Sequence, residues 1–215
     1  MVTFNKFLNT FDENSQIKGK QFEHFVKWFL KNDPYWKTQV DKVWLWDEWP
    51  ENWGPDHGID LIFKHKNSDI WAVQAKCYNP DYPITKADVD TFLSESSRKE
   101  INKRLLISTT DIIGPNARQV CENQEKQVTR FLYTDFDKAE IEYPDEFSNL
   151  TKAKPRKKPS PRDHQTNAIK DVVKGFENNN KGQMIMACGT GKTFATLWIK
   201  EKIQSKSTLV LVPSL

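Results

Sequence analysis

The stretch DHGIDLIFKHKNSDIWAVQAK (residues 56–76) contains two apolar runs separated by a short polar segment. The alternation of apolar and polar side chains predicts two adjacent β-strands. In both runs the larger apolar residues have odd numbers: Ile59, Leu61 and Phe63, then Trp71, Val73 and Ala75. If both sets face one core, Leu61 pairs with an odd-numbered residue such as Val73 or Ala75, which requires a connecting loop of odd length or a bulge.

The same register brings together three polar residues that interrupt the runs. Asp60 lies opposite Gln74 or Lys76, so all three share one face within a few ångströms of each other. One interpretation is a solvated face with an Asp60–Lys76 ion pair, which contributes little to stability. The other is a metal site, because a carboxylate, an amide oxygen and a backbone carbonyl suit a hard cation such as Mg²⁺. An adjacent lysine can then hold an attacking water or stabilise developing negative charge. The pattern alone leaves both interpretations open.

The surrounding sequence predicts further helices and strands. Helical spacing of apolar residues and the positions of turn formers predict helices over 19–32, 84–100 and 116–127, and strands over 41–46, 103–109 and 130–135. The order is helix, three strands, then helix and strand twice. It predicts an α/β domain, a mixed sheet flanked by helices, over residues 1–147.

A basic, proline-containing linker is predicted over residues 148–160. The segment TKAKPRKKPSPR (residues 151–162) has six basic residues, three prolines and no acidic residue. Such a segment should be extended and solvated. It can serve only as a stiff, soluble spacer, or it can also contact DNA phosphates.

A second pattern occupies residues 161–215. Helices are predicted over 164–176 and 191–203, and strands over 183–188 and 208–214. This order is one β-α-β unit with a preceding helix, which is smaller than a complete domain of its kind.

The segment MACGTGKT (residues 186–193) has the composition of a phosphate-binding loop between strand and helix. Its glycines, Gly189 and Gly191, let backbone N–H groups, including that of Thr190, point at phosphate oxygens, and the following helix adds its dipole. Lys192 would reach the β- and γ-phosphates of ATP, and the Thr193 hydroxyl would hold Mg²⁺. The strict motif has glycine where this sequence has Met186.

The loop resembles the form M-A-x-G-T-G-K-T of superfamily 2 helicases and translocases. The segment PRDHQTNAI resembles their Q motif, which implies that Gln165 reads adenine, and LVLVPS resembles the start of motif Ia. The resemblance therefore implies the beginning of a RecA-like ATPase lobe. The Walker B acids and the second lobe with its arginine finger are not in this sequence, so we expect no ATP turnover by these 215 residues. DNA-stimulated phosphate release from this chain would contradict that expectation.

The first domain resembles the PD-(D/E)xK nucleases in their Mrr-like form, G-x-D…Q-x-K. Asp60 and Gln74-Ala75-Lys76 match the motif, and KQFEHFVKWFL resembles the family's first helix, with Glu23 in its acidic position. The resemblance implies a restriction-endonuclease-like fold in which Asp60, Gln74 and the Ala75 carbonyl ligate Mg²⁺. It also implies that Lys76 assists the nucleophilic water and that Glu23 lies at the site's edge, for a second metal. Most of the superfamily has Glu at the position of Gln74, so one negative charge is missing.

Two further features have alternative interpretations. His57 can act as a general base near the metal or cap the turn before its strand. Four tryptophans can stack on exposed bases or pack in the core and anchor loops; they are Trp44, Trp46, Trp49 and Trp53.

The whole chain resembles the N-terminal part of type ISP restriction–modification enzymes, single polypeptides with a nuclease, a helicase-like ATPase and an adenine methyltransferase. The resemblance implies a Mg²⁺-dependent endonuclease acting on double-stranded DNA, with ATP and, in a longer parent, S-adenosylmethionine as cofactors and the downstream domains as partners. The alternatives are an inactive nuclease fold used for DNA binding or docking, a type I restriction motor subunit, or a repair helicase–nuclease. No 18-residue apolar run or signal peptide is visible, and the three widely spaced cysteines predict neither disulfides nor a zinc site, so we expect a cytoplasmic protein without membrane partners.

Overall fold

The chain divides into two compact units, Met1–Arg156 and Lys157–Leu215. The computed structural model describes residues 2–54, 58–152, 159–187, 189–203, 207–209 and 211. Among these residues, every helix is too short or too polar to cross a membrane.

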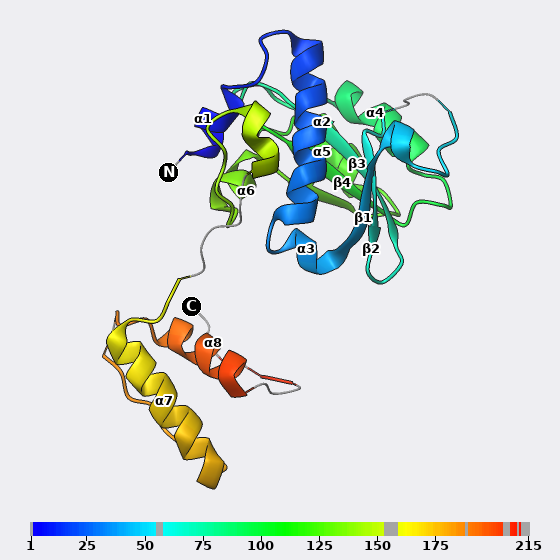
Figure 1. Cartoon of the computed structure of the whole chain (residues 1–215). Helices are drawn as coiled ribbons and strands as arrows, with labels where there is room; N and C mark the ends of the chain where they lie inside the picture. The colour runs from blue at the N-terminus through cyan, green and yellow to red at the C-terminus, as the bar shows by residue number, and fades with distance from the viewer. Residues whose placement is uncertain are drawn as a thin grey trace. The chain divides into compact units, whose positions relative to one another are not determined.

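A five-stranded sheet forms the centre of the first unit (Figure 1). Its strands, in spatial as well as chain order, are β1 (Val40–Leu45), β2 (Leu61–His65), β3 (Ile70–Lys76), β4 (Lys103–Ser108) and β5 (Val128–Phe131). Neighbouring strands are antiparallel from β1 to β3 and parallel from β3 to β5. The predicted mixed sheet is therefore confirmed.

Helices and two apolar cores cover the two faces of this sheet. The helical segments of the unit are α1 (Phe4–Leu8), α2 (Ser15–Asn32), α3 (Trp36–Gln39), η1 (Trp46–Glu48), α4 (Lys86–Glu95), α5 (Pro115–Glu122), α6 (Tyr133–Lys138) and η2 (Phe147–Lys152). The α2-side core joins Phe22 and Phe25 of α2 to Phe63 of β2. The α4-side core joins Phe92 of α4 to Ile62 of β2. The sheet is therefore buried on both faces, as the predicted α/β architecture requires.

The hairpin between β2 and β3 has the register that residue parity predicts. Leu61 pairs with Val73, and the alternation places the odd-numbered residues of both strands in the α2-side core and the even-numbered ones toward α4. The prediction was wrong for Ile59, which precedes β2 and packs in the α4-side core. The His65 N–H donates to the Asp69 carbonyl at 2.8 Å, which leaves a three-residue loop. Ser68, the last loop residue, has a φ of 76°, the left-handed conformation common at this position of three-residue hairpins. The odd-length loop is thus confirmed.

The last strand of the sheet ends earlier than predicted. A strand was expected over 130–135, but β5 stops at Phe131 and α6 follows at once. The Asp135 carboxylate accepts a hydrogen bond from the Leu132 N–H at 2.8 Å, which starts a helix. The helix then buries Phe136 completely against aromatic neighbours in the α2-side core. Capping and tertiary packing outweigh the local strand propensity here.

The second unit contains two helices, α7 (Asp163–Asn178) and α8 (Lys192–Ile203), as the sequence predicts. The two strands predicted beside them do not form in the described residues, which cover 183–187 of the first and 208, 209 and 211 of the second. Ile185 and Leu209 are 85% and 82% exposed. A strand of this type is stable only between hydrogen-bonded strands, and the described part of the second unit contains no strand. The remaining residues of both predicted strands lie outside those parts.

Candidate active site

Asp60 is held rigidly at the start of β2. Its N–H donates to the Val73 carbonyl at 3.0 Å, and its own carbonyl accepts from the Trp46 N–H at 2.9 Å. Its carboxylate oxygen Oδ2 accepts a hydrogen bond from the Ala75 N–H at 2.6 Å. The side chain therefore lies across the end of β3, beside the Gln74-Ala75-Lys76 segment, as the sequence predicts.

Gln74 is buried, with 3% of its surface exposed, and its amide group has a defined orientation. The side-chain Nε2 donates to the Gly58 carbonyl at 3.0 Å. That bond identifies the other terminal atom as the oxygen Oε1, which is buried and accepts no hydrogen bond from any residue that the structure describes. A buried acceptor without a donor is costly unless something else satisfies it, and a cation would do so.

Gly58 is required where it orients Gln74. Its φ is +87°, in the left-handed region that glycine adopts most easily. A Cβ atom added there would lie 3.2 Å from the Phe92 nitrogen and 3.3 Å from the Thr91 Cβ, both on α4. The backbone of α4 therefore presses directly on the residue whose carbonyl holds the Gln74 amide.

We expect Gly58→Ala to destabilise the domain by about 1–3 kcal/mol, because alanine is strained at this φ and crowds α4. The Gly58 carbonyl would also move away from Gln74. Urea unfolding monitored by circular dichroism measures the stability. The matched control is Gly19→Ala, inside α2, where no described atom would lie within 4 Å of the added Cβ, so that variant should be as stable as the wild type or more so. Equal stability of the two variants would contradict the prediction.

Lys76 ends β3 on the same side of the strand as Gln74. Its carbonyl accepts hydrogen bonds from the Thr109 N–H at 3.1 Å and the Ser108 hydroxyl at 3.0 Å, so its backbone is fixed at the end of β4. Its side chain is half-buried. The structure thus gathers Asp60, Gln74 and Lys76 at one end of the sheet.

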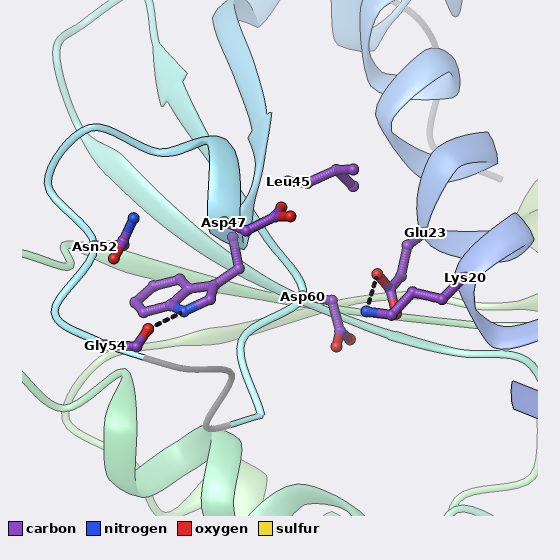
Figure 2. A pocket seen from close by; sticks show the side chains of 8 residues that line it. Lys20, Glu23, Leu45, Asp47, Asn52, Gly54 and Asp60 are labelled. Atoms are coloured by element: carbon purple, nitrogen blue, oxygen red, sulfur yellow. Dashed lines mark hydrogen bonds and ion pairs between the residues drawn. The ribbon is translucent and has the colours of Figure 1, made fainter.

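A cavity of about 350 Å³ opens beside Asp60 (Figure 2). It is lined by Lys20, Glu23, Leu45, Trp46, Asp47, Asn52, Gly54 and Asp60. Lys20 and Glu23 reach into it from α2 and form an ion pair, with 2.9 Å between Lys20 Nζ and Glu23 Oε2. Glu23, predicted at the edge of the site, therefore shares this cavity with Asp60. Asp47 and Asn52 also line the cavity, and no sequence pattern marked them as site residues.

The donor set fits a hard divalent cation. Asp60 supplies a carboxylate, and Gln74 supplies a buried amide oxygen without a described donor. The described residues contain no group of three or more His, Cys, Asp or Glu side chains arranged to hold a metal. A search for acidic clusters alone would therefore not find this site. The site combines one carboxylate with neutral oxygens, and it is suited to Mg²⁺ rather than to a soft metal.

The tryptophan loop beside the cavity is a packed structure. The rings of Trp46, Trp49 and Trp53 contact one another with centroids 4.7 to 5.7 Å apart, and the first two are almost fully buried. Trp46 Nε1 donates to the Gly54 carbonyl at 2.9 Å, and the Arg98 guanidinium lies 4.5 Å from the Trp53 ring. Their burial agrees with the prediction that these tryptophans pack in the core and anchor the loop. The proposed alternatives for His57 concern a residue outside the described parts of the chain.

The segment predicted to bind phosphate lies against Gln165 in the second unit. Gly189 and Gly191 have φ values of +76° and +81°, so the backbone curls as the motif requires. Gln165 is 5% exposed; its Nε2 donates to the Thr190 carbonyl at 2.9 Å, and its Oε1 accepts from the Arg162 N–H at 2.9 Å. Both ends of this amide are bonded within the unit. The contact of Gln165 with adenine therefore stays a prediction.

The basic and hydroxyl side chains of the loop lie at the start of α8. Lys192 is the first residue of that helix, and its Nζ donates to the carbonyls of Met186 at 3.1 Å and Ala187 at 3.3 Å. Thr193 follows in the first turn. Helix N–H groups and a lysine at one loop provide the charges that bind phosphate.

A family model described as "Restriction endonuclease", of the Mrr type, matches residues 31–153, more than half of the chain. The chain belongs to the Mrr-like restriction endonuclease family. A second model, described as "Type III restriction enzyme, res subunit", matches residues 158–215, so the Mrr-like domain is followed by the start of a helicase-related domain. No curated protein sequence matches the chain.

One solved structure agrees with this assignment. The Mrr-like chain is 30% identical to the "ATP-dependent Type ISP restriction-modification enzyme LlaBIII bound to DNA", with a TM-score of 0.75 over 97% of its residues. It spans only 13% of that enzyme's length. Lower similarity is found to the modification-dependent restriction endonuclease AspBHI, with a TM-score of 0.42, 14% identity, and coverage of 69% of this chain and 36% of that one.

Proposed function

We propose that the first unit is a Mg²⁺-dependent endonuclease that nicks DNA by hydrolysing phosphodiester bonds. The observation that carries this proposal is the buried Gln74 Oε1, without a described donor, in the segment Gln74-Ala75-Lys76, whose Ala75 N–H holds the Asp60 carboxylate. Asp60, Gln74 and the Ala75 carbonyl would hold the cation, and Glu23 in the adjoining cavity could hold a second one. A bound Mg²⁺ supplies Lewis acidity and a lowered pKa for bound water.

The chain's own residues position the reaction. The Ala75 N–H keeps the Asp60 carboxylate at the end of β3, and the Gly58 carbonyl keeps the Gln74 oxygen turned away from itself. Lys76 brings a positive charge that holds the attacking water or stabilises negative charge on the phosphate oxygens. The water oxygen bonds to phosphorus and gives up a proton, one P–O ester bond breaks, and the leaving oxygen takes up a proton.

The test is nicking of supercoiled plasmid by the 215-residue chain with Mg²⁺, with EDTA, and with the variant Lys76→Met. We expect nicked circles only with the metal, and a rate roughly 100-fold lower for the variant, because a preorganised charge near the reacting phosphate contributes about that much. Undiminished nicking in EDTA or by Lys76→Met would refute the proposal.

A second candidate function is DNA binding or docking without cleavage. Gln74 stands where most of the superfamily has Glu, and the missing negative charge favours weaker metal binding. Under this alternative the chain shifts DNA in a gel but never nicks it at any Mg²⁺ concentration.

For the longer protein, we propose an ATP-dependent, DNA-translocating restriction–modification enzyme acting on double-stranded DNA in the cytoplasm. The Mrr-like and helicase-related matches and the likeness to LlaBIII support it. Gln165, Gly189, Thr190, Gly191, Lys192 and Thr193 would bind ATP and its Mg²⁺, and a methyltransferase domain would use S-adenosylmethionine. Methyltransferase motifs downstream of Leu215 in the gene would support this proposal; their absence would favour a type I motor subunit or a repair helicase–nuclease.

A further inference from the structure

The polar side of β3 continues past the end of the strand to Tyr78. Thr109 ties this segment to the end of β4, because it accepts a hydrogen bond from the Tyr78 N–H at 2.7 Å and donates to the Tyr78 carbonyl at 2.6 Å. Cys77 packs against the α2-side core and Tyr78 against the α4-side core, so the alternation of the strand is preserved. Gln74, Lys76 and Tyr78 therefore follow one another on the side that faces α4.

Tyr78 is bonded to a carboxylate that is itself immobilised. The Tyr78 hydroxyl donates to Asp88 Oδ1 at 2.7 Å. The other carboxylate oxygen, Oδ2, accepts from both the N–H and the hydroxyl of Thr85, each at 2.7 Å, at the start of α4. With both oxygens engaged, the Asp88 side chain cannot rotate without losing a hydrogen bond, and its charge has a fixed position.

Charges connect this pair to the candidate active site. Burial and the hydrogen bond to Asp88 raise the pKa of Tyr78, and the charge of Asp60 acts in the same direction. Burial raises the pKa of Asp88, but the hydrogen bonds from Tyr78 and Thr85 outweigh it, and the positive charge of Lys76 lowers that pKa further. Asp88 is thus a fixed anion at the start of α4, on the side of β3 that Lys76 and Tyr78 face.

We propose that Tyr78 and Asp88 are positioning residues that hold Lys76 in place for the nuclease reaction. The inference rests on the proposed function. A lysine side chain is long and flexible, and it acts reproducibly on a phosphate or a water only if a fixed opposite charge restricts it. Asp88 provides that charge, and Tyr78 anchors both Asp88 and the chain segment that leaves Lys76. Neither residue need touch the DNA or the metal.

The experiment uses the 215-residue chain and compares Tyr78→Phe and Asp88→Asn in plasmid nicking over a range of DNA concentrations. We expect kcat to fall roughly 10-fold for each, as for other residues that orient a catalytic group, with the KM for DNA changed by no more than about twofold. The double variant should be little worse than either single variant, because both substitutions break the same contact. The matched controls are Tyr82→Phe, whose exposed ring contacts Tyr78, and Asp90→Asn, an exposed carboxylate of α4 paired with Lys86; both should retain the wild-type kcat.

The outcomes separate this inference from the proposed function. Wild-type kcat in both Tyr78→Phe and Asp88→Asn, with an active wild-type chain, would overturn the positioning role and leave the nuclease assignment intact. An equal loss in Asp90→Asn would also overturn it, because any carboxylate of α4 would then serve. An inactive wild-type chain would overturn both proposals. Circular dichroism reports the folded fraction, and if Asp88→Asn unfolds, Tyr78→Phe, which removes one oxygen atom, decides the matter.

Discussion

Asp60→Ala should reduce plasmid nicking by roughly 1,000-fold, to the background rate. The substitution removes the carboxylate that accepts the Ala75 N–H, and with it a negative charge that would hold the cation there. Initial rates at saturating Mg²⁺ measure the effect. DNA binding should persist, since phosphate contacts elsewhere supply most of the affinity.

The structural cost of this substitution can be separated from the chemical one. Alanine leaves the Ala75 N–H without its acceptor, which costs about 1–3 kcal/mol of stability. Asp60→Asn keeps an oxygen for that N–H and should be more stable, yet equally inactive because the charge is gone. Asp41→Ala, at an exposed position of β1, is the control for loss of one carboxylate and should nick like the wild type. Nicking by Asp60→Asn at the wild-type rate would show that the carboxylate charge is not needed.

Gln74→Leu should lower the nicking rate by about 100-fold and raise the Mg²⁺ concentration needed for half-maximal activity. Leucine has no oxygen ligand, and it is close to glutamine in volume, so the buried position stays filled. The Gly58 carbonyl loses its donor, which is unfavourable, but the buried Oε1 without a described donor disappears as well. These two effects oppose each other, so we expect stability within about 1 kcal/mol of the wild type.

A Mg²⁺ titration of the nicking rate tests this prediction, with Gln74→Glu as the matched comparison. Glutamate keeps an oxygen ligand and adds the charge found in most of the superfamily, so that variant should remain active. A wild-type Mg²⁺ dependence in Gln74→Leu would mean that the side-chain oxygen is not a ligand, whatever the activity of Asp60→Ala.

The core of the candidate site was predictable because it depends on a local rule. The odd-numbered apolar residues of two adjacent runs can share a core in few registers, and those registers place Asp60 beside Gln74. The mixed sheet and its two layers follow from element order and periodicity. None of these inferences requires knowing how a long loop runs through space.

The rest of the site depends on tertiary structure that periodicity does not encode. Asp47 and Asn52 reach the cavity because packed tryptophans direct their loop toward α2. The partnership of Tyr78 with Asp88 depends on where α4 begins in space. The strands expected over 183–188 and 208–214 do not form in the residues of these ranges that the structure describes. A strand's stability comes from its neighbours more than from its own sequence, so the local pattern alone was a poor guide there.

One helix contacts the residues that flank the candidate motif on both sides. The backbone of α4 packs against Gly58, whose carbonyl turns the Gln74 amide, and Asp88 on its first turn holds Tyr78. A small displacement of α4 would therefore disturb Gln74, the proposed metal ligand, and the segment that follows Lys76 at the same moment. The proposed site should therefore gain or lose its geometry as a unit.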